Sequence, residues 1–112
     1  MIDAYSFGRI RIDGRDYTSD VIIYPGRVDA SWWRKQGHLL QLADLADVLR
    51  QPPEVLVVGT GASGMMLVAP EVEEIAAELG IRLLVRRSPE ACQEYNRLSP
   101  QRRIIACLHL TC

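Results

Sequence analysis

The sequence lacks the cysteine pattern of a disulfide-bonded secreted domain. It contains three cysteines, Cys92, Cys107 and Cys112, which is an odd number and includes no C-x-x-C pair. Small secreted domains use an even number of cysteines at regular spacings. We therefore expect free thiols in a reducing compartment, which predicts a cytoplasmic protein.

Long apolar runs and a basic surplus are also missing. No run approaches the roughly 18 residues of a spanning helix, and no apolar segment follows a basic stretch near residue 1. We expect neither a membrane span nor an export signal. The formal net charge is -1, whereas nucleic acids and acidic membranes attract proteins with a large basic surplus. The composition therefore predicts no nucleic-acid partner and no membrane partner.

The residues that are present suit one soluble globular domain over residues 1–112, with 48% hydrophobic and 24% charged residues. The charges are unevenly distributed. Residues 41–80 include seven acidic residues and one arginine, whereas residues 81–112 include six arginines and two glutamates. This asymmetry indicates either an electrostatic surface for a partner or two solvated faces of opposite charge.

Residues 2–33 predict an antiparallel meander. The pair Asp13-Gly14 follows an apolar alternation and favours a hairpin turn, because both residues tolerate positive φ. The run Val21–Tyr24 supplies a returning strand, and Pro25-Gly26 predicts the next turn.

The second half alternates helices with strands, so the fold class is α/β. A helix between two buried strands predicts that these strands are parallel. We expect Ser88 to cap the last helix. The alternation in the last strand places Ile105, Cys107 and His109 on one face. The predicted helices cover about 42–50, 70–79 and 88–98, and the predicted strands cover 55–58, 65–68, 81–85 and 104–110.

A glycine-rich stretch, Gly59-Thr-Gly-Ala-Ser-Gly64, follows the buried strand and matches the letters of a dinucleotide-binding fingerprint. Two departures argue against a dinucleotide. Residues 65–69 separate the motif from the helix whose amides would hold the pyrophosphate, and Arg86-Arg87 stand where an acidic residue is expected. We predict a structural turn that can leave amides free for a small anion, and no cofactor.

The cysteines and histidines invite a metal or thiol interpretation. Cys107 and His109 share one side of a strand, but two ligands are too few for a metal site and no standard spacing supplies the others. The simpler interpretation is a set of buried thiols with a hydrogen-bonded histidine. We predict no metal and no catalytic residue.

A pair of adjacent tryptophans is a stronger indication of a functional surface than the cysteines and histidines. Trp32 and Trp33 are adjacent and cannot both enter one core from an extended segment, so one should cover a hydrophobic surface while the other lies nearer to solvent. Arg34 follows them directly. Exposed aromatic residues beside basic ones are enriched at protein interfaces. We predict an interaction surface at Trp32, Trp33 and Arg34.

Six short segments, in order and spread over nearly the whole chain, together indicate a protein family. They are Trp32-Trp33, Gly37-His38, Val55–Gly61, Glu90–Asn96, Arg103–Ala106 and His109–Cys112. Together they resemble the domain-of-unknown-function family 498, whose relatives include the adipogenesis-associated domain protein and mitochondrial respiratory complex I assembly factor three.

That resemblance implies a single domain with three layers, a mixed central sheet with helices and an additional N-terminal β-hairpin layer. It implies no established enzymatic activity, and it favours a binding or assembly role because the better-understood relatives act through protein partners. Many relatives have Glu-Gly where this chain has Gln101-Arg102. The chain also lacks their mitochondrial presequence, so we expect a cytoplasmic location.

Two hypotheses of function follow. The first is a non-enzymatic protein-interaction or assembly factor with a protein partner, acting through Trp32, Trp33 and Arg34. The alternative is a binder of a small molecule or a small anionic ligand, or an enzyme that acts on one, whose pocket lies at the glycine loop at the carboxyl end of the Val55 strand. The residues predicted for that pocket are Gly59, Thr60, Gly61, Ser63, His38 and Arg103.

Overall fold

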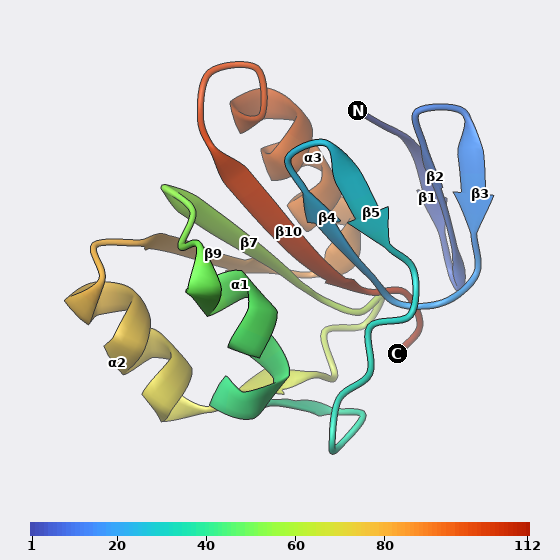
Figure 1. The fold of residues 1–112 in the computed structure, drawn as a ribbon. Helices are drawn as coiled ribbons and strands as arrows, with labels where there is room; N and C mark the ends of the chain where they lie inside the picture. The colour runs from blue at the N-terminus through green and yellow to red at the C-terminus, as the bar shows by residue number, and fades with distance from the viewer.

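The computed structural model describes residues 1–112 and contains ten strands, three α-helices and one 3-10 turn (Figure 1). The strands are β1 (Ile2–Ser6), β2 (Arg9–Ile12), β3 (Arg15–Tyr17), β4 (Val21–Tyr24), β5 (Arg27–Asp29), β6 (Leu39–Leu40), β7 (Val55–Thr60), β8 (Leu67–Val68), β9 (Arg82–Arg86) and β10 (Ile104–His109). The helical segments are the 3-10 turn η1 (Leu42–Leu45), α1 (Ala46–Arg50), α2 (Pro70–Glu78) and α3 (Ser88–Leu98).

A mixed five-stranded sheet forms the centre of the molecule, in the order β5-β4-β10-β7-β9. Strands β10, β7 and β9 are parallel, whereas β4 and β5 pair antiparallel. Every residue of β7 and of β10 is buried. This burial explains their near-continuous apolar sequence, because a central strand covered on both faces has no solvent side.

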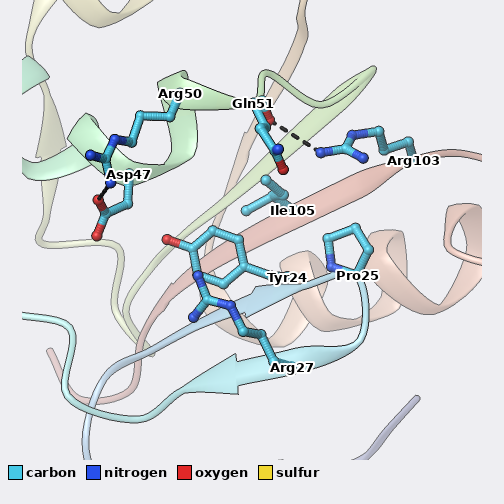
Figure 2. A pocket seen from close by; sticks show the side chains of 8 residues that line it. All are labelled: Tyr24, Pro25, Arg27, Asp47, Arg50, Gln51, Arg103 and Ile105. Carbon is cyan, nitrogen blue, oxygen red and sulfur yellow. Dashed lines mark hydrogen bonds and ion pairs between the residues drawn. The ribbon is translucent and has the colours of Figure 1, made fainter.

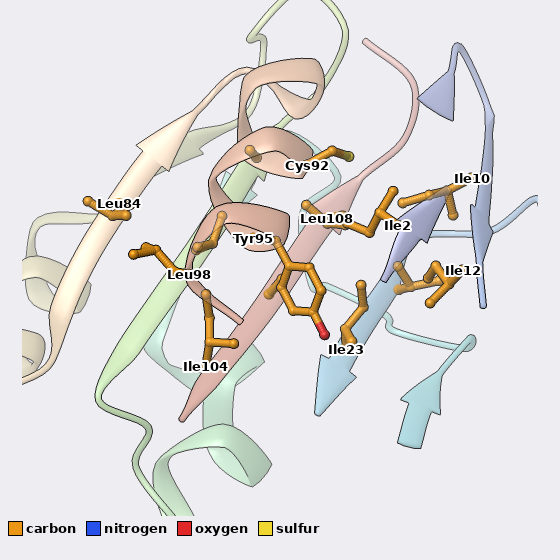
Figure 3. Close-up of a cluster of buried hydrophobic side chains, with 14 of the residues drawn as sticks. Ile2, Ile10, Ile12, Ile23, Leu84, Cys92, Tyr95, Leu98, Ile104 and Leu108 are labelled. Carbon is orange, nitrogen blue, oxygen red and sulfur yellow. The ribbon is translucent and has the colours of Figure 1, made fainter. Parts of the chain in front are cut away.

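Two layers cover this sheet. Helices α1 and α2 lie on one face, and α3 lies on the other (Figure 1). The three-stranded sheet β1-β2-β3 packs beside α3 and closes a core of 16 buried residues, several of which are drawn in Figure 3. The opposite core contains 14 buried residues, including Ile105 and Cys107. The predicted alternation of the last strand is thereby confirmed, as is the three-layer α/β architecture.

The single meander predicted for residues 2–33 is wrong in one respect. Strands β1 to β3 form a sheet of their own, while the β4–β5 hairpin joins the central sheet through the pairing of β4 with β10. The burial pattern gives the physical reason. In β2 buried and exposed residues alternate, as in a strand with one solvated face, whereas Val21, Ile22 and Ile23 of β4 are all buried.

Two further expectations are corrected. The prediction that β9 is a buried strand is wrong, because β9 lies at the edge of the sheet and only Leu84 among its residues is buried. Ser88 does not cap α3, since Arg87 occupies the N-cap position and no side chain caps the helix. The Ser88 hydroxyl turns instead toward the ends of β7 and β10.

Candidate functional site

The carboxyl ends of the two central strands lie side by side. The parallel register of β7 and β10 pairs Thr60 with His109. The glycine loop leaves the sheet after Thr60, and the backbone amide of Leu67 beyond that loop donates to the carbonyl oxygen of His38 (2.8 Å). Three segments distant in sequence therefore meet at this end, where parallel sheets commonly bind ligands.

Asp20, Arg34 and His109 form a charged cluster at this end. Atom Nη1 of Arg34 lies 2.9 Å from Oδ2 of Asp20, at ion-pair distance. Atom Nη2 of Arg34 donates to the carbonyl oxygen of Gly37 (2.8 Å) and lies 3.1 Å from Nδ1 of His109. The Arg34 side chain is only 4% exposed. A buried guanidinium of this kind requires such partners.

The histidine proton can be assigned from these contacts. Nδ1 of His109 lies 2.8 Å from Oδ2 of Asp20, and the arginine can only donate. The ionised carboxylate of Asp20 can only accept, so we assign the Nδ1 proton to the hydrogen bond with Asp20. The contact of Arg34 Nη2 with Nδ1 is then a close approach and not a hydrogen bond. Nε2 is buried without a hydrogen-bond partner. The ring of His38 packs edge-on against His109, with 5.7 Å between ring centroids.

Two opposing effects determine the pKa of Asp20. Burial raises the pKa of this carboxyl, but hydrogen bonds from His109 and from the Leu110 amide outweigh that effect, and the pKa lies below its ordinary value. The Leu110 amide donates to Oδ1 over 2.8 Å. The carboxylate is therefore ionised at neutral pH and holds Arg34, His109 and Leu110 together.

The glycine loop is filled by the chain itself. The Gly61 amide donates to Oγ of Ser88 (2.9 Å), the Ala62 amide to the carbonyl oxygen of Thr111 (2.7 Å) and the Met65 amide to that of Cys112 (2.9 Å). Gly61 and its neighbours thus use their amides internally. An anion site at Gly59, Thr60, Gly61 and Ser63 stays a prediction, and the exposed Ser63 is its most accessible member.

Steric constraints explain why glycine occupies two positions in and before the loop. A Cβ atom on Gly59 would lie 2.8 Å from Oγ of Ser88 and 3.3 Å from Cβ of Ala91, so this glycine lets α3 approach the sheet. A Cβ atom on Gly61 would lie 2.3 Å from the carbonyl carbon of Cys112, and Gly61 also has a φ of +105°. Both positions are explained by packing within the protein.

Two of the three cysteines, Cys92 and Cys107, are buried free thiols. Burial raises the pKa of the Cys107 thiol, and it raises the pKa of Cys92 to about 12. A thiol that stays protonated is a poor nucleophile. Ser88 is also occupied, because its Oγ donates to the carbonyl oxygen of His109. No group of three or more His, Cys, Asp and Glu side chains is arranged to hold a metal ion.

The two tryptophans separate as expected. Trp32 is 9% exposed, packs into the core and lies under the guanidinium of Arg34, 4.6 Å from the ring centroid. Trp33 is 75% exposed. The prediction that one ring covers a hydrophobic surface while the other faces solvent is confirmed. Arg34, in contrast, is buried with Trp32, so of the three predicted interaction residues only Trp33 is presented to solvent.

Arg103 is not near the glycine loop. It immediately precedes β10, whose first residue pairs with Val55 at the amino end of β7. The loop follows the opposite end of β7. His38 is brought to the loop, whereas Arg103 is one strand length away from it and lines a different cleft.

Sequence reasoning missed Asp20 and Ser88. The partner of Asp20 is His109, 89 positions later, and the sequence offers no local signal for such a contact. Ser88 precedes a proline at a helix start, which indicates a cap rather than a bridge between strands.

Comparisons with known proteins agree with this architecture. A family model described as "Protein of unknown function (DUF498/DUF598)" matches residues 2–109. The solved structure of the conserved hypothetical protein PH1505 from Pyrococcus horikoshii OT3 is 29% identical, with a TM-score of 0.86 over 100% of this chain and 99% of that one. The protein MT938 is 28% identical, with a TM-score of 0.83 over 100% and 98% of the two chains.

A third structure supports the fold alone. A protein from Bordetella pertussis, described as a Mth938-like domain, is 24% identical, with a TM-score of 0.70 over 98% of this chain and 85% of that one. None of the helices in the present structure has the length and apolar character needed to cross a bilayer.

Proposed function

The chain belongs to the DUF498/DUF598 family, and from this premise we propose that it is a non-enzymatic interaction or assembly factor that binds a partner protein. The proposed contact is the carboxyl-end surface, which we define as Phe7, Trp33, Met65 and Leu67. The observation that carries the proposal is Trp33, a tryptophan ring 75% exposed to solvent. Tryptophan is among the residues most enriched at interface hot spots.

The other three members of the carboxyl-end surface support it. Phe7 is 64% exposed, Met65 is 54% exposed and Leu67 is 68% exposed. Single exposed apolar residues are ordinary, but the segments that carry Phe7, Met65 and Leu67 meet at the carboxyl end of the central strands. Trp33 lies in a shallow hollow with Asp29, Ala43 and Asp47, and its chain neighbour Arg34 reaches His109 at the same end. The Gly8 amide beside Phe7 donates to the carbonyl oxygen of Leu110 (2.8 Å), and the Met65 amide donates to the carbonyl oxygen of Cys112.

The segment that carries Trp33 is held firmly. Its two chain neighbours, Trp32 and Arg34, are both buried. The Trp32 indole nitrogen donates to the carbonyl oxygen of Asp44 (3.2 Å), and Arg34 is bound to Asp20 and Gly37. A ring presented from a fixed backbone loses little conformational entropy on binding, which favours affinity.

The test compares partner capture by the wild-type protein and by Trp33→Ala. Each is immobilised in native lysate of the source organism, and bound proteins are quantified over a range of bait concentrations. We expect one saturable partner whose dissociation constant rises about 30-fold or more in Trp33→Ala, since truncation of a hot spot costs about 2 kcal/mol or more. The melting temperature should not change, because the ring is exposed.

Leu79→Ala is the matched control. Leu79 is 46% exposed at the C-terminal end of α2, outside the carboxyl-end surface. Its truncation should leave capture unchanged. Absence of any saturable partner, or equal loss in Leu79→Ala and Trp33→Ala, would contradict the proposal.

A further inference from the structure

A cleft of about 570 Å³ opens at the amino end of β10, at the opposite end of the sheet from the glycine loop. Figure 2 shows Arg50 and Arg103 on opposite sides of this cleft, with Ile105 between them, and Arg27 against the ring of Tyr24. The side chains that matter here are Tyr24, Arg27, Asp47, Arg50, Gln51 and Arg103.

The three arginines are only partly neutralised by the protein. Arg50 lies 3.4 Å from a carboxylate oxygen of Asp47, and both side chains are largely exposed, so this pair is weak. Arg103 donates to the carbonyl oxygen of Gln51 (3.3 Å), which carries no charge. Arg27 lies over the Tyr24 ring, 4.0 Å from its centroid.

Neither Arg27 nor Arg103 forms an ion pair through its guanidinium. Three guanidinium groups and the single carboxylate of Asp47 leave the cleft with a charge of +2. The whole chain carries -1. The positive charge is therefore concentrated in a hollow of the surface, where it attracts small anions more effectively than on a flat face.

The wall of the cleft also holds an unsatisfied donor. The Tyr24 hydroxyl is buried and has no hydrogen-bond partner. Burial raises the pKa of Tyr24, so its hydroxyl keeps its proton and can donate. Buried polar groups without a partner are uncommon in folded proteins and point to a missing water, ion or ligand.

We propose that this cleft binds a small molecule that carries two anionic groups, each a phosphate or a carboxylate, with Arg27, Arg50 and Arg103 as the cationic partners. Planar guanidinium groups match the oxygens of carboxylate and phosphate in bidentate geometry. One anionic group neutralises Arg103 on its side of the cleft. The other takes the place of Asp47 beside Arg50 and draws Arg27 from the tyrosine ring, so that Tyr24 can donate to it.

The size of the cleft favours a small molecule over a polymer. Its volume of about 570 Å³ falls within the range of about 300–1,000 Å³ that is typical of small-molecule sites. Extended polyanions such as nucleic acids require a basic stripe and a basic surplus. The cleft is instead a local concavity in a chain of net charge -1.

The test is isothermal titration of the full chain at low ionic strength with four probes: inorganic phosphate, a phosphorylated carboxylic acid of three carbons, succinate and acetate. We expect saturable binding of the two-group probes, weaker binding of phosphate and none of acetate. Arg27→Gln and Arg103→Gln should each weaken binding about tenfold or more, because charge-assisted hydrogen bonds contribute about 1.5–3 kcal/mol. The phosphorylated acid and succinate together distinguish phosphate from carboxylate recognition.

Two further variants separate binding from folding. Arg82→Gln removes an exposed arginine outside the cleft and should leave binding unchanged. Tyr24→Phe removes the unsatisfied hydroxyl, so the free protein should be at least as stable while binding of the preferred probe weakens. Equal weakening in Arg82→Gln, binding of heparin alone, or no binding of any probe at millimolar concentration would overturn the proposal. Capture of a protein partner through Trp33 is unaffected by these outcomes.

Discussion

At the residue scale, Asp20 ties together three parts of the chain. Its carboxylate accepts from the Leu110 amide, lies 2.8 Å from Nδ1 of His109 and forms the ion pair with Arg34. Removal of one member of a buried pair costs more than the pair contributes, because the remaining charge is left unpaired. The cluster therefore determines where the segment that carries Trp33 lies.

Asp20→Asn should lower the free energy of unfolding by about 2–4 kcal/mol at pH 7. Since the pKa of Asp20 is lowered in the folded state, its contribution is present above the unfolded-state pKa near 3.8. It is lost as the pH falls from that value through the lower folded-state pKa. Urea unfolding at pH 7 and pH 3 measures the free energy of unfolding of both proteins. The difference in this free energy between Asp20→Asn and wild type should be smaller at pH 3.

Asp47→Asn provides the control for Asp20→Asn. Asp47 forms an exposed pair with Arg50, and its loss should change stability by about 0.5 kcal/mol or less. A destabilisation by Asp20→Asn that is the same at both pH values would contradict the assigned ion pair.

At the element scale, the turn after β7 is specified by backbone space rather than by a ligand. Gly59 admits α3 against the sheet, and Gly61 admits the residues Thr111 and Cys112. Ser88 of α3 links both, since its Oγ accepts from the Gly61 amide and donates to the His109 carbonyl. The ends of β7, β10 and α3 therefore form one hydrogen-bonded unit.

Gly61→Ala should destabilise the protein by about 3 kcal/mol or more. The substitution adds left-handed backbone strain of about 1–2 kcal/mol to a Cβ contact of 2.3 Å with the backbone of Cys112. Gly80→Ala is the matched control, because Gly80 also has positive φ (+70°) but has no atom within 4 Å of the added Cβ. We expect Gly80→Ala to lower the free energy of unfolding only by the backbone strain, as measured by thermal or urea unfolding. Equal costs would indicate that the backbone at Cys112 moves freely away.

At the scale of the whole molecule, the N-terminal sheet is joined to the central layers through α3. The side chain of Asn96 binds both backbone groups of Ile2: it accepts from the Ile2 amide and donates to the Ile2 carbonyl, each over 2.8 Å. The Tyr5 hydroxyl donates to the Leu110 carbonyl oxygen (2.8 Å). An asparagine thus acts here as a further hydrogen-bonding partner for the edge of a strand.

Asn96→Ala should lower the free energy of unfolding by about 2 kcal/mol, since it removes two hydrogen bonds of about 1 kcal/mol each. Hydrogen exchange should accelerate in β1 and β2 more than in β7, because the outer sheet loses its attachment. Arg97→Ala is the control, because the Arg97 side chain is exposed and pairs with Glu94 of the same helix, and it should change neither quantity beyond about 0.5 kcal/mol. Uniform acceleration across all strands would refute a specific attachment of the outer sheet by Asn96.

Much of the secondary structure could be predicted because its causes are local. Proline marks the start of α2, and Gly80 with positive φ follows its end. Positive φ at Asp13 and Gly14 makes the turn between β2 and β3. Apolar runs identified the central strands. The sequence indicated that one tryptophan is buried and the other exposed, but not that Trp33 is the exposed one. Of the residues predicted for the loop pocket, His38 lies beside the loop and Arg103 lies at the other end of the sheet, and the pocket itself stays a prediction.

The α/β alternation, the two faces of β10 and the family resemblance could all be read from the amino-acid sequence, because hydrophobic periodicity and turn residues act over a few positions. Three features required the folded molecule: β4 leaves the N-terminal meander to pair with β10, Thr111 and Cys112 occupy the glycine loop, and Asp20 meets Arg34 and His109. These contacts join residues far apart in the chain, and their energies depend on burial and on partners that no local pattern encodes.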